Sequence, residues 1–235
     1  MGRYIVLSRI LVMASSNFTS DSGVGTTSCD GYALISGNAS WSAIRNGSGT
    51  SASATGTSSN LGIQASNVSN KFNAIARLFF IFDTSSIPVD ATVTSATLYI
   101  TPTSRTTTIG GSSFAVSNTT TGSNTNISSS DYALVGDTVL SNSINTSSLV
   151  INSLNPFTLN STGLTNITKG GITKLAVREN SYDIPDIAPT WVSSGRALIT
   201  VAMIEYGSAP RRPYLTVTYT EAGGNVNKDN FFLAL

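Results

Sequence analysis

Histidine is absent from this chain of 235 residues, and Cys29 is its only cysteine. Without histidine, neither a histidine-based catalytic triad nor a histidine metal site can be built. A lone cysteine excludes an internal disulfide framework, so apolar packing has to hold the fold together. Because no histidine can activate Cys29, we expect a buried and inert thiol there rather than a nucleophile.

Charge is also scarce. Charged residues make up 11% of the chain and the formal net charge is +1, whereas soluble domains usually contain about a quarter charged residues. The polar surface must therefore consist of Ser, Thr and Asn side chains, which suits extracellular and virion proteins. Electrostatic binding of nucleic acid needs clustered lysine and arginine, and no basic run occurs, so no nucleic-acid partner is expected.

The first residues, MGRYIVLSRILVMASS, have the outline of a secretory signal: a basic start, an apolar run and small residues. Arg9 interrupts the apolar stretch, however, and the stretch is too short to span a bilayer as a helix. No membrane partner is expected. Since the segment is rich in β-branched residues, we interpret residues 1–29 as an added strand or an arm that packs on a neighbour.

Alternating apolar side chains predict β-strands along the chain. Both faces of the strand predicted at residues 74–83 are apolar, with Leu78 and Phe80 on one face and Phe79 and Ile81 on the other. Further strands are expected at residues 31–36, 40–46, 60–66, 92–100, 113–118, 155–160, 172–179, 196–205 and 213–220. Clusters of Gly, Asn and Ser separate them, as turns require.

The pattern predicts an all-β fold, an antiparallel β-sandwich or jelly roll, with a single domain over residues 30–220. One short helical turn is expected in TGLTNITKGG, with Ser161 as its cap and Gly170 or Gly171 at its end. Residues 118–148 are rich in Ser, Thr and Asn and are expected to form a long surface excursion, within which DYALVGDTVL is ordered.

The stretch RLFFIFDTSSIPVDATVTSATLYI resembles the signature of DNRLRE-type β-sandwich domains. The matching positions are Arg77, Phe82, Asp83, Ser86, Ile87, Pro88, Ala96 and Leu98. SWSAIRNGSGTSAS, APTW and RPYLTVTYT are also similar to such domains, so the resemblance spans roughly residues 30–220. It implies a β-sandwich. Such domains occur in secreted bacterial and archaeal wall-associated proteins, some of them similar to carbohydrate-binding modules, and similar sequences occur in bacteriophage structural proteins.

Two apolar features are interface candidates. Ile81 stands where DNRLRE-type domains often have a polar or basic residue, and with Phe79 it makes the outer face of its strand apolar. Either the chain covers this face itself, through the N-terminal segment or residues 118–148, or another subunit covers it. The second feature is the segment 221–235, a frayed tail or a docking peptide, whose apolar end includes Phe231, Phe232 and Leu233.

Residues with chemical potential are few. The densest carboxylates are Glu179, Asp183 and Asp186, which we interpret as solvated turn residues, as ligands of a structural Ca²⁺, or, more remotely, as a glycosidase acid and base. The aromatic candidates for stacking on sugar rings are Trp191, Tyr182 and Trp41, with core packing as the alternative for both tryptophans. No catalytic residue and no cofactor other than the candidate Ca²⁺ is predicted.

These observations favour a non-enzymatic structural protein on the outside of a particle. The predicted function is a bacteriophage virion component, a capsid decoration or a tail or fibre part, which forms a homo-oligomer and contacts other particle proteins. The alternative is an extracellular carbohydrate-binding module or adhesin of a secreted or cell-surface system, with surface glycans as its partners.

Overall fold

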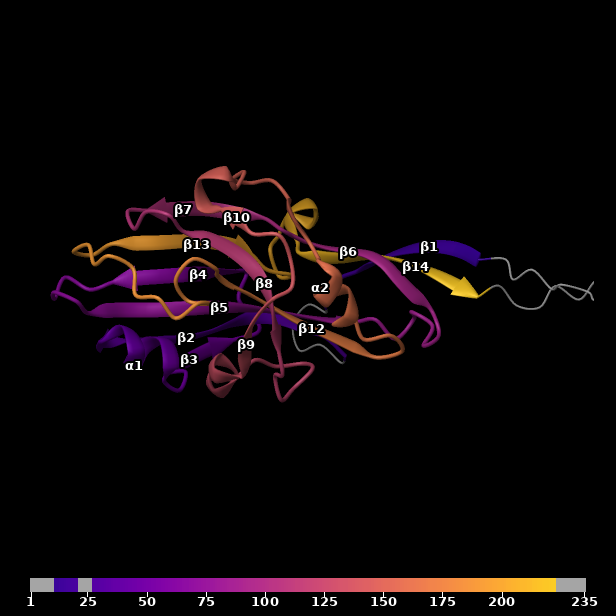
Figure 1. Cartoon of the computed structure of the whole chain (residues 1–235), viewed down its shortest axis with the longest axis horizontal. Coiled ribbons are helices and arrows are strands. Elements are labelled where there is room, and N and C mark those ends of the chain that lie inside the picture. Colours follow the sequence, from indigo (N-terminus) through magenta and orange to yellow (C-terminus); the bar gives the residue numbers. More distant parts are fainter. Residues whose placement is uncertain (1–10, 21–26, 223–235) are drawn as a thin grey trace, which may run out of the picture.

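The computed structural model describes residues 11–20 and 27–222. Two antiparallel sheets face each other across an apolar core, so the fold is the predicted all-β sandwich (Figure 1). The smaller sheet has the order β1-β14-β6-β11. Its strands are Leu11–Phe18, Tyr214–Ala222, Thr92–Ile100 and Asn155–Thr158.

The larger sheet has the order β10-β8-β12-β5-β4-β13-β7, while β2 pairs with β5 and β3, and β9 pairs with β8. In that order its strands are Ile144–Asn145, Ser113–Thr119, Ile172–Glu179, Phe72–Asp83, Ser58–Ala65, Arg196–Ala202 and Pro102–Thr107, followed by Cys29–Ala39 (β2), Ser51–Ser53 (β3) and Val135–Val139 (β9). The helices are α1 (Trp41–Asn46), α2 (Ser161–Thr165) and the 3₁₀ helices η1 (Ser129–Leu134), η2 (Thr146–Ser148) and η3 (Ala209–Arg211).

Strand β5 is the centre of the larger sheet. It pairs with β2 along one edge, while β4 and β12 share its other edge: β4 pairs with residues 72–76 and β12 with residues 78–83. Arg77 lies where the edge passes from β4 to β12. The side chains of β5 alternate as predicted, with Leu78 and Phe80 in the sandwich core and Phe79 and Ile81 in a second core on the opposite face of the sheet.

This second core is covered by the chain itself. Phe79 and Ile81 are completely buried. They belong to an apolar cluster that includes Ile44 of α1 and Ile127 and Tyr132 from the 118–148 excursion. Intrachain cover is therefore the explanation that holds, and Phe79 and Ile81 are removed as subunit-interface candidates.

Two local predictions were wrong. Residues 40–46, predicted as a strand, contain helix α1, because the Ser40 hydroxyl accepts a hydrogen bond from the Ala43 amide as an N-cap and Trp41 and Ile44 bury one helical face. The helical turn predicted near residues 162–171 exists as helix α2, but its cap is Asn160 rather than Ser161, since the Asn160 side chain accepts from the Gly163 amide. The helix also ends at Thr165, before the predicted Gly170 or Gly171. Strands β3, β7, β9 and β10 were not predicted.

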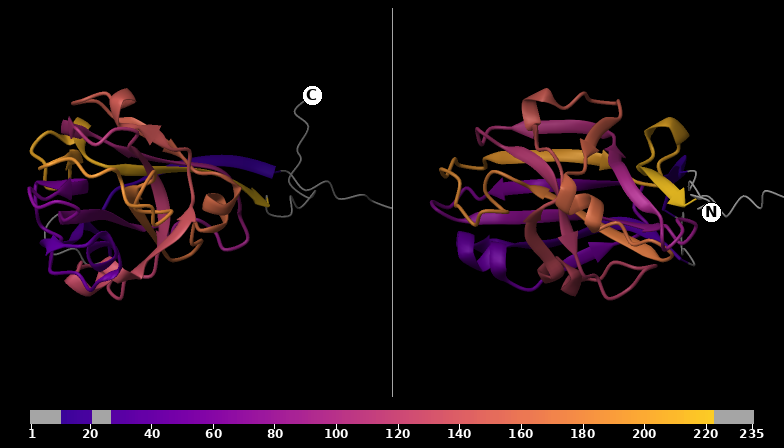
Figure 2. Two further views of the ribbon diagram at one scale, coloured as in Figure 1. Left: turned by 60° about the vertical axis from the view of Figure 1, so that its left-hand side comes forward. Right: turned by 45° about the vertical axis from the view of Figure 1, so that its right-hand side comes forward.

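The N-terminal segment contributes a strand of the sandwich. Strand β1 pairs with β14 over its whole length, from Leu11 opposite Ala222 to Phe18 opposite Leu215. The two strands run side by side past the rest of the sandwich, at the end where the N- and C-terminal segments leave the described fold (Figures 1 and 2). Phe231, Phe232 and Leu233 lie outside the described residues. In the described part, no helix is long and apolar enough to cross a membrane.

The start of β2 places two titratable groups in the interior. Burial raises the pKa of the Cys29 thiol to about 12, which agrees with the inert cysteine expected from the sequence. Asp30 is 1% exposed; its Oδ2 accepts from the Ile204 amide at 2.9 Å, and its Oδ1 has no hydrogen-bond partner. Burial, together with the nearby Glu205 charge, raises the pKa of Asp30 from 3.8 to about 8.

Asp30 should therefore make the protein less stable as pH rises. A carboxyl whose pKa is higher in the folded state binds its proton more tightly there, so stability falls from about pH 4 to pH 8, between the two pKa values. Asp30→Asn should match the wild type near pH 3 and exceed its unfolding free energy at pH 9 by on the order of a few kcal/mol. Denaturant unfolding at both pH values, with the exposed Asp90→Asn as control, measures this; equal gaps at the two pH values would refute it.

Candidate functional site

The loop after β12 is folded by Glu179. Its buried carboxylate accepts hydrogen bonds from the backbone amides of Ser181, Tyr182 and Asp183 at 2.6–3.1 Å, and from the amide of Ser113 at 3.2 Å. Burial raises the pKa of Glu179, and these four amides oppose that rise. The resulting tight turn directs the side chain of Asp183 into the protein.

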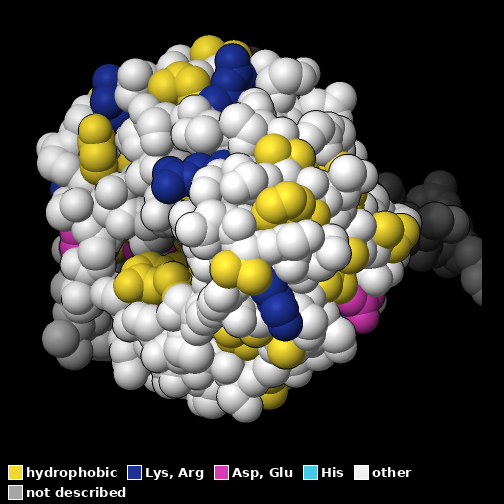
Figure 3. Space-filling view, turned by 90° about the vertical axis from the view of Figure 1, so that its left-hand side faces the viewer, with side chains coloured by type: hydrophobic (Ala, Val, Ile, Leu, Met, Phe, Trp, Pro, Cys, Tyr) yellow, Lys and Arg dark blue, Asp and Glu magenta, His cyan; other side chains and the backbone are white. Residues whose placement is uncertain are grey.

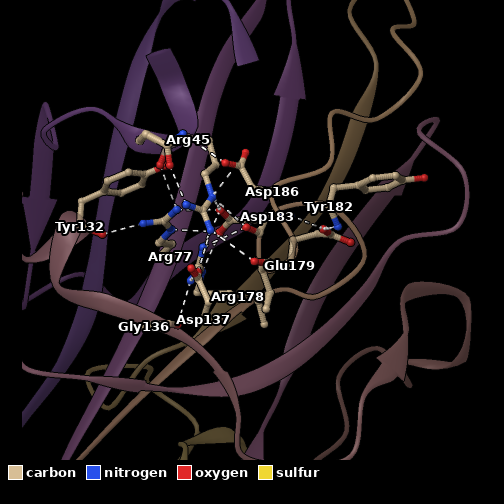
Figure 4. A network of polar contacts seen from close by, with 12 residues as sticks. Arg45, Arg77, Tyr132, Gly136, Asp137, Arg178, Glu179, Tyr182, Asp183 and Asp186 are labelled. Carbon is tan, nitrogen blue, oxygen red and sulfur yellow. Dashed lines mark hydrogen bonds and ion pairs between the residues drawn. The ribbon is translucent and has the colours of Figure 1, made fainter. Parts of the chain in front are cut away.

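Asp183 lies between two arginines that come from neighbouring strands (Figure 4). Arg77 of β5 donates through Nε to Oδ2 at 3.0 Å and through Nη2 to Oδ1 at 2.6 Å. Arg178 of β12 donates in the same way, at 3.0 and 2.8 Å. Both contacts are bidentate, the strongest geometry for a guanidinium and a carboxylate. All three side chains are at most 3% exposed.

A third arginine extends this cluster to α1. Arg45 donates to the backbone carbonyl of Asp183 at 3.0 Å and to Asp137 Oδ1 at 2.7 Å. Asp137 also accepts from Arg178 at 2.6 Å, and Asp186 lies 3.8 Å from Arg45. The three arginines are thus balanced by three aspartates, and the cluster joins α1, β5, β9, β12 and the loop after β12.

Arg77 also holds the excursion in place. Its guanidinium donates to the Tyr132 carbonyl at 2.7 Å and lies 3.9 Å from the centroid of the Tyr132 ring. The Tyr132 hydroxyl in turn donates to the carbonyl of Ile44 in α1 at 2.9 Å. The polar cluster therefore holds α1 and η1, which cover the second core, against the larger sheet.

The protonation state of Asp183 follows from these contacts. Burial alone would raise its pKa, but the charge of Arg77 and the charge and hydrogen bonds of Arg178 outweigh burial and lower the pKa to about 2. A carboxylate that is completely buried and that holds no proton at neutral pH is poorly suited to general acid or base catalysis. Its geometry fits a structural role.

The structure brings the three predicted metal candidates into one loop but gives their oxygens other partners. Glu179 is occupied by amides, Asp183 by two guanidinium groups, and Asp186 accepts from the Trp41 indole at 3.0 Å and from Asn46. Among the residues that the structure describes, no group of three carboxylate, Cys or His side chains is placed to hold a metal ion. A cation at Asp183 would also lie beside the positive charges of the arginines.

The three aromatic candidates differ in access. Trp41 is 9% exposed and packs edge-to-face on Phe72, so its ring faces are not available to a sugar. Tyr182 points away from the arginines (Figure 4), and its hydroxyl donates to the Gly110 carbonyl. Trp191 is half-buried against the second core, and its indole nitrogen has no hydrogen-bond partner. Trp191 and Tyr182 therefore keep partly accessible rings, and Trp41 does not.

No protein-family model matches this chain, and no curated protein matches it either. The resemblance to DNRLRE-type domains stays a prediction.

The arginine partners of Asp183 were not predicted, although the sequence held a signal for them. Arg77 interrupts an apolar face between Ile75 and Phe79. A buried arginine needs a carboxylate partner, and the densest carboxylate group in the chain is that of residues 179–186. Pairing these two facts would have indicated an ion pair before any metal site.

Removing the charge of Asp183 should be costly. Asp183→Asn leaves Arg77 and Arg178 buried without their shared counter-charge, and we expect the unfolding free energy to fall by about 3–5 kcal/mol at pH 7. Because the pKa of Asp183 is lowered to about 2, its contribution is present above pH 4 and is lost as pH falls through 2. The gap between wild type and variant should therefore narrow toward pH 2 in denaturant titrations.

The matched control is Asp186→Asn in the same loop. Asp186 has a 45% exposed side chain and a left-handed backbone (φ 54°) that asparagine also adopts readily. Its loss should cost about 1 kcal/mol or less. Equal losses in the two variants would contradict a special role for Asp183.

Proposed function

We propose that this protein is a non-enzymatic structural component of a bacteriophage particle, displayed on the exterior as a capsid decoration or as part of a tail or fibre. The observation that carries the proposal is that the two ends of the fold differ. Both terminal segments leave the fold together at the end of the β1–β14 pair, and the β4–β5 and β12–β13 connections lie at the opposite end (Figure 1). Such a molecule can be attached by one end and display the other.

The β4–β5 and β12–β13 connections form what we call the display end, and the surface of this end agrees with the proposed role. Figure 3 shows that it consists mainly of uncharged polar side chains and backbone, with scattered hydrophobic side chains and few charges. Among its exposed residues are Val68, Ile187 and Val192, from the two connections. Arg45, Arg77 and Arg178 form their ion pairs inside the cluster around Asp183.

The sequences that precede β1 and follow β14 contain the apolar residues that docking needs. Residues 1–10 include Tyr4, Ile5 and Leu7, and the end of the chain includes Phe231 and Phe232. Apolar side chains at the two chain ends suit contacts with neighbouring subunits or other particle proteins.

Deleting residues 223–235 should weaken assembly without unfolding the sandwich, because β14 ends at Ala222 and keeps all its partners. Size-exclusion chromatography with light scattering should show an oligomer for the full chain and smaller species for the deletion variant. Circular dichroism supplies the control for folding. A deletion variant that assembles as the full chain does would remove the docking role of the tail.

Carbohydrate binding is the second candidate, and the partly accessible rings of Trp191 and Tyr182 at the display end favour it. If the protein binds glycans there, Trp191→Ala should reduce binding by up to about tenfold, since packing on an aromatic ring contributes roughly 0.5–1.5 kcal/mol. A glycan array followed by titration calorimetry measures this. The buried Trp41→Phe is the control, and binding unaffected by Trp191→Ala would place the sugar elsewhere.

A further inference from the structure

Exposed strand edges are protected almost everywhere in this fold. An edge strand offers unpaired N–H and C=O groups to other chains, and proteins commonly block it with proline, charge, irregularity or shortness. At one edge of the smaller sheet, β11 has four residues and contains Pro156. In the larger sheet, β3 and β10 have three and two residues, and the pairing of β9 with β8 is irregular.

The long edge strand β7 is covered by another route. It begins with Pro102, and its Arg105 reaches out to the carbonyls of Thr146, Ser147 and Leu149 at 2.7–3.1 Å. These contacts hold the η2 segment against the strand.

Strand β1 has none of these protections. It runs for eight residues, LVMASSNF, without proline, glycine or charge, and it pairs with β14 in unbroken register. Among the described residues, β14 is its only partner strand, so its other edge is open. Val12 and Met13 are 51% and 71% exposed. An uncharged, regular and unprotected edge is the arrangement that favours strand pairing between chains.

We propose that the open edge of β1 pairs antiparallel with β1 of a second copy of this chain, which joins two four-stranded sheets into one. Two features favour a second copy over a different protein. Antiparallel pairing about a two-fold axis makes the strand its own complement, so each copy offers the other the same edge. An uncharged strand also meets no like charge when it faces itself, whereas a foreign partner would be selected by charges that β1 lacks.

This pairing fixes the relative direction of the two copies. In an antiparallel pair, Leu11 of one copy lies toward the Phe18 end of the other. The inference rests on the proposed function only for the expectation that many copies lie close together. It concerns a different contact from the docking tail.

Charge placed on the edge tests the pairing. Ser15 is an exposed residue in the middle of β1. In a two-fold pair, Ser15→Lys brings two positive charges close together, and Ser15→Glu brings two negative ones. Each variant alone should raise the dimer dissociation constant about tenfold or more, because like charges opposed across strands are destabilising. An equal mixture of the two variants should restore dimers. Light scattering and native mass spectrometry measure both effects.

The control variant is Thr158→Lys, an exposed position on β11 at the other edge of the same sheet. It should leave the dimer unchanged. In the full chain, Ser15→Cys should also give disulfide-linked dimers under mild oxidation, because Cys29 is buried and leaves the new thiol as the reactive one.

The outcomes separate this inference from the proposed function. Dimers that resist both charged variants, or variants whose mixture fails to restore pairing, would overturn the β1 pairing. If assembly then still depended on residues 223–235, the proposed function would stand. A chain that is monomeric at all accessible concentrations would overturn the pairing and would also count against the particle role.

Discussion

The contact of Asp183 with Arg77 and Arg178 determines how the larger sheet is covered. One carboxylate receives four hydrogen bonds from two guanidinium groups, and each arginine also donates to backbone carbonyls, such as those of Tyr132 and Gly136. Apolar packing alone would let the covering segments slide over β5 and β12. Bidentate pairs of fixed geometry oppose this sliding. The covering segments α1, η1 and the loop after β12 are therefore each held in one position on the sheet.

The placement of charge also shapes the surface. A chain with few charged residues places three arginines and three aspartates in one cluster, and Arg77, Arg178 and Asp183 of this cluster are buried. The rest of the surface consists mainly of hydroxyl and amide groups, with few charges and a net charge near zero. Repulsion between copies is weak for such a surface, and close packing of many copies is correspondingly easy.

The sequence predicted those parts of the fold that depend on local period. The alternation of β5, its two apolar faces and the strand β6 that follows it in sequence could be inferred, because the residues of each strand show its pattern of burial directly. Strand β7 could not, since PTSRTT has no apolar alternation, and α1 could not, because its helix depends on a single cap at Ser40. The partner of Arg77 lies 106 residues away, and periodicity carries no information about pairs so distant. Only the match between a buried arginine and the densest group of carboxylates could have indicated it.

The same separation has a consequence for the order in which the protein is made. The strands β2 and β4 are synthesised before β5, so their pairings with β5 can form early. The second partner of its other edge, β12, and the counter-charge for Arg77 emerge about 100 residues later, which at 5–20 residues per second corresponds to roughly 5–20 seconds. During that interval, a phenylalanine-rich strand with two apolar faces and an unneutralised arginine is present without its cover. Newly synthesised chains are therefore prone to aggregate at β5. Ribosomes that follow one another closely on a messenger RNA would bring such chains together at that stage.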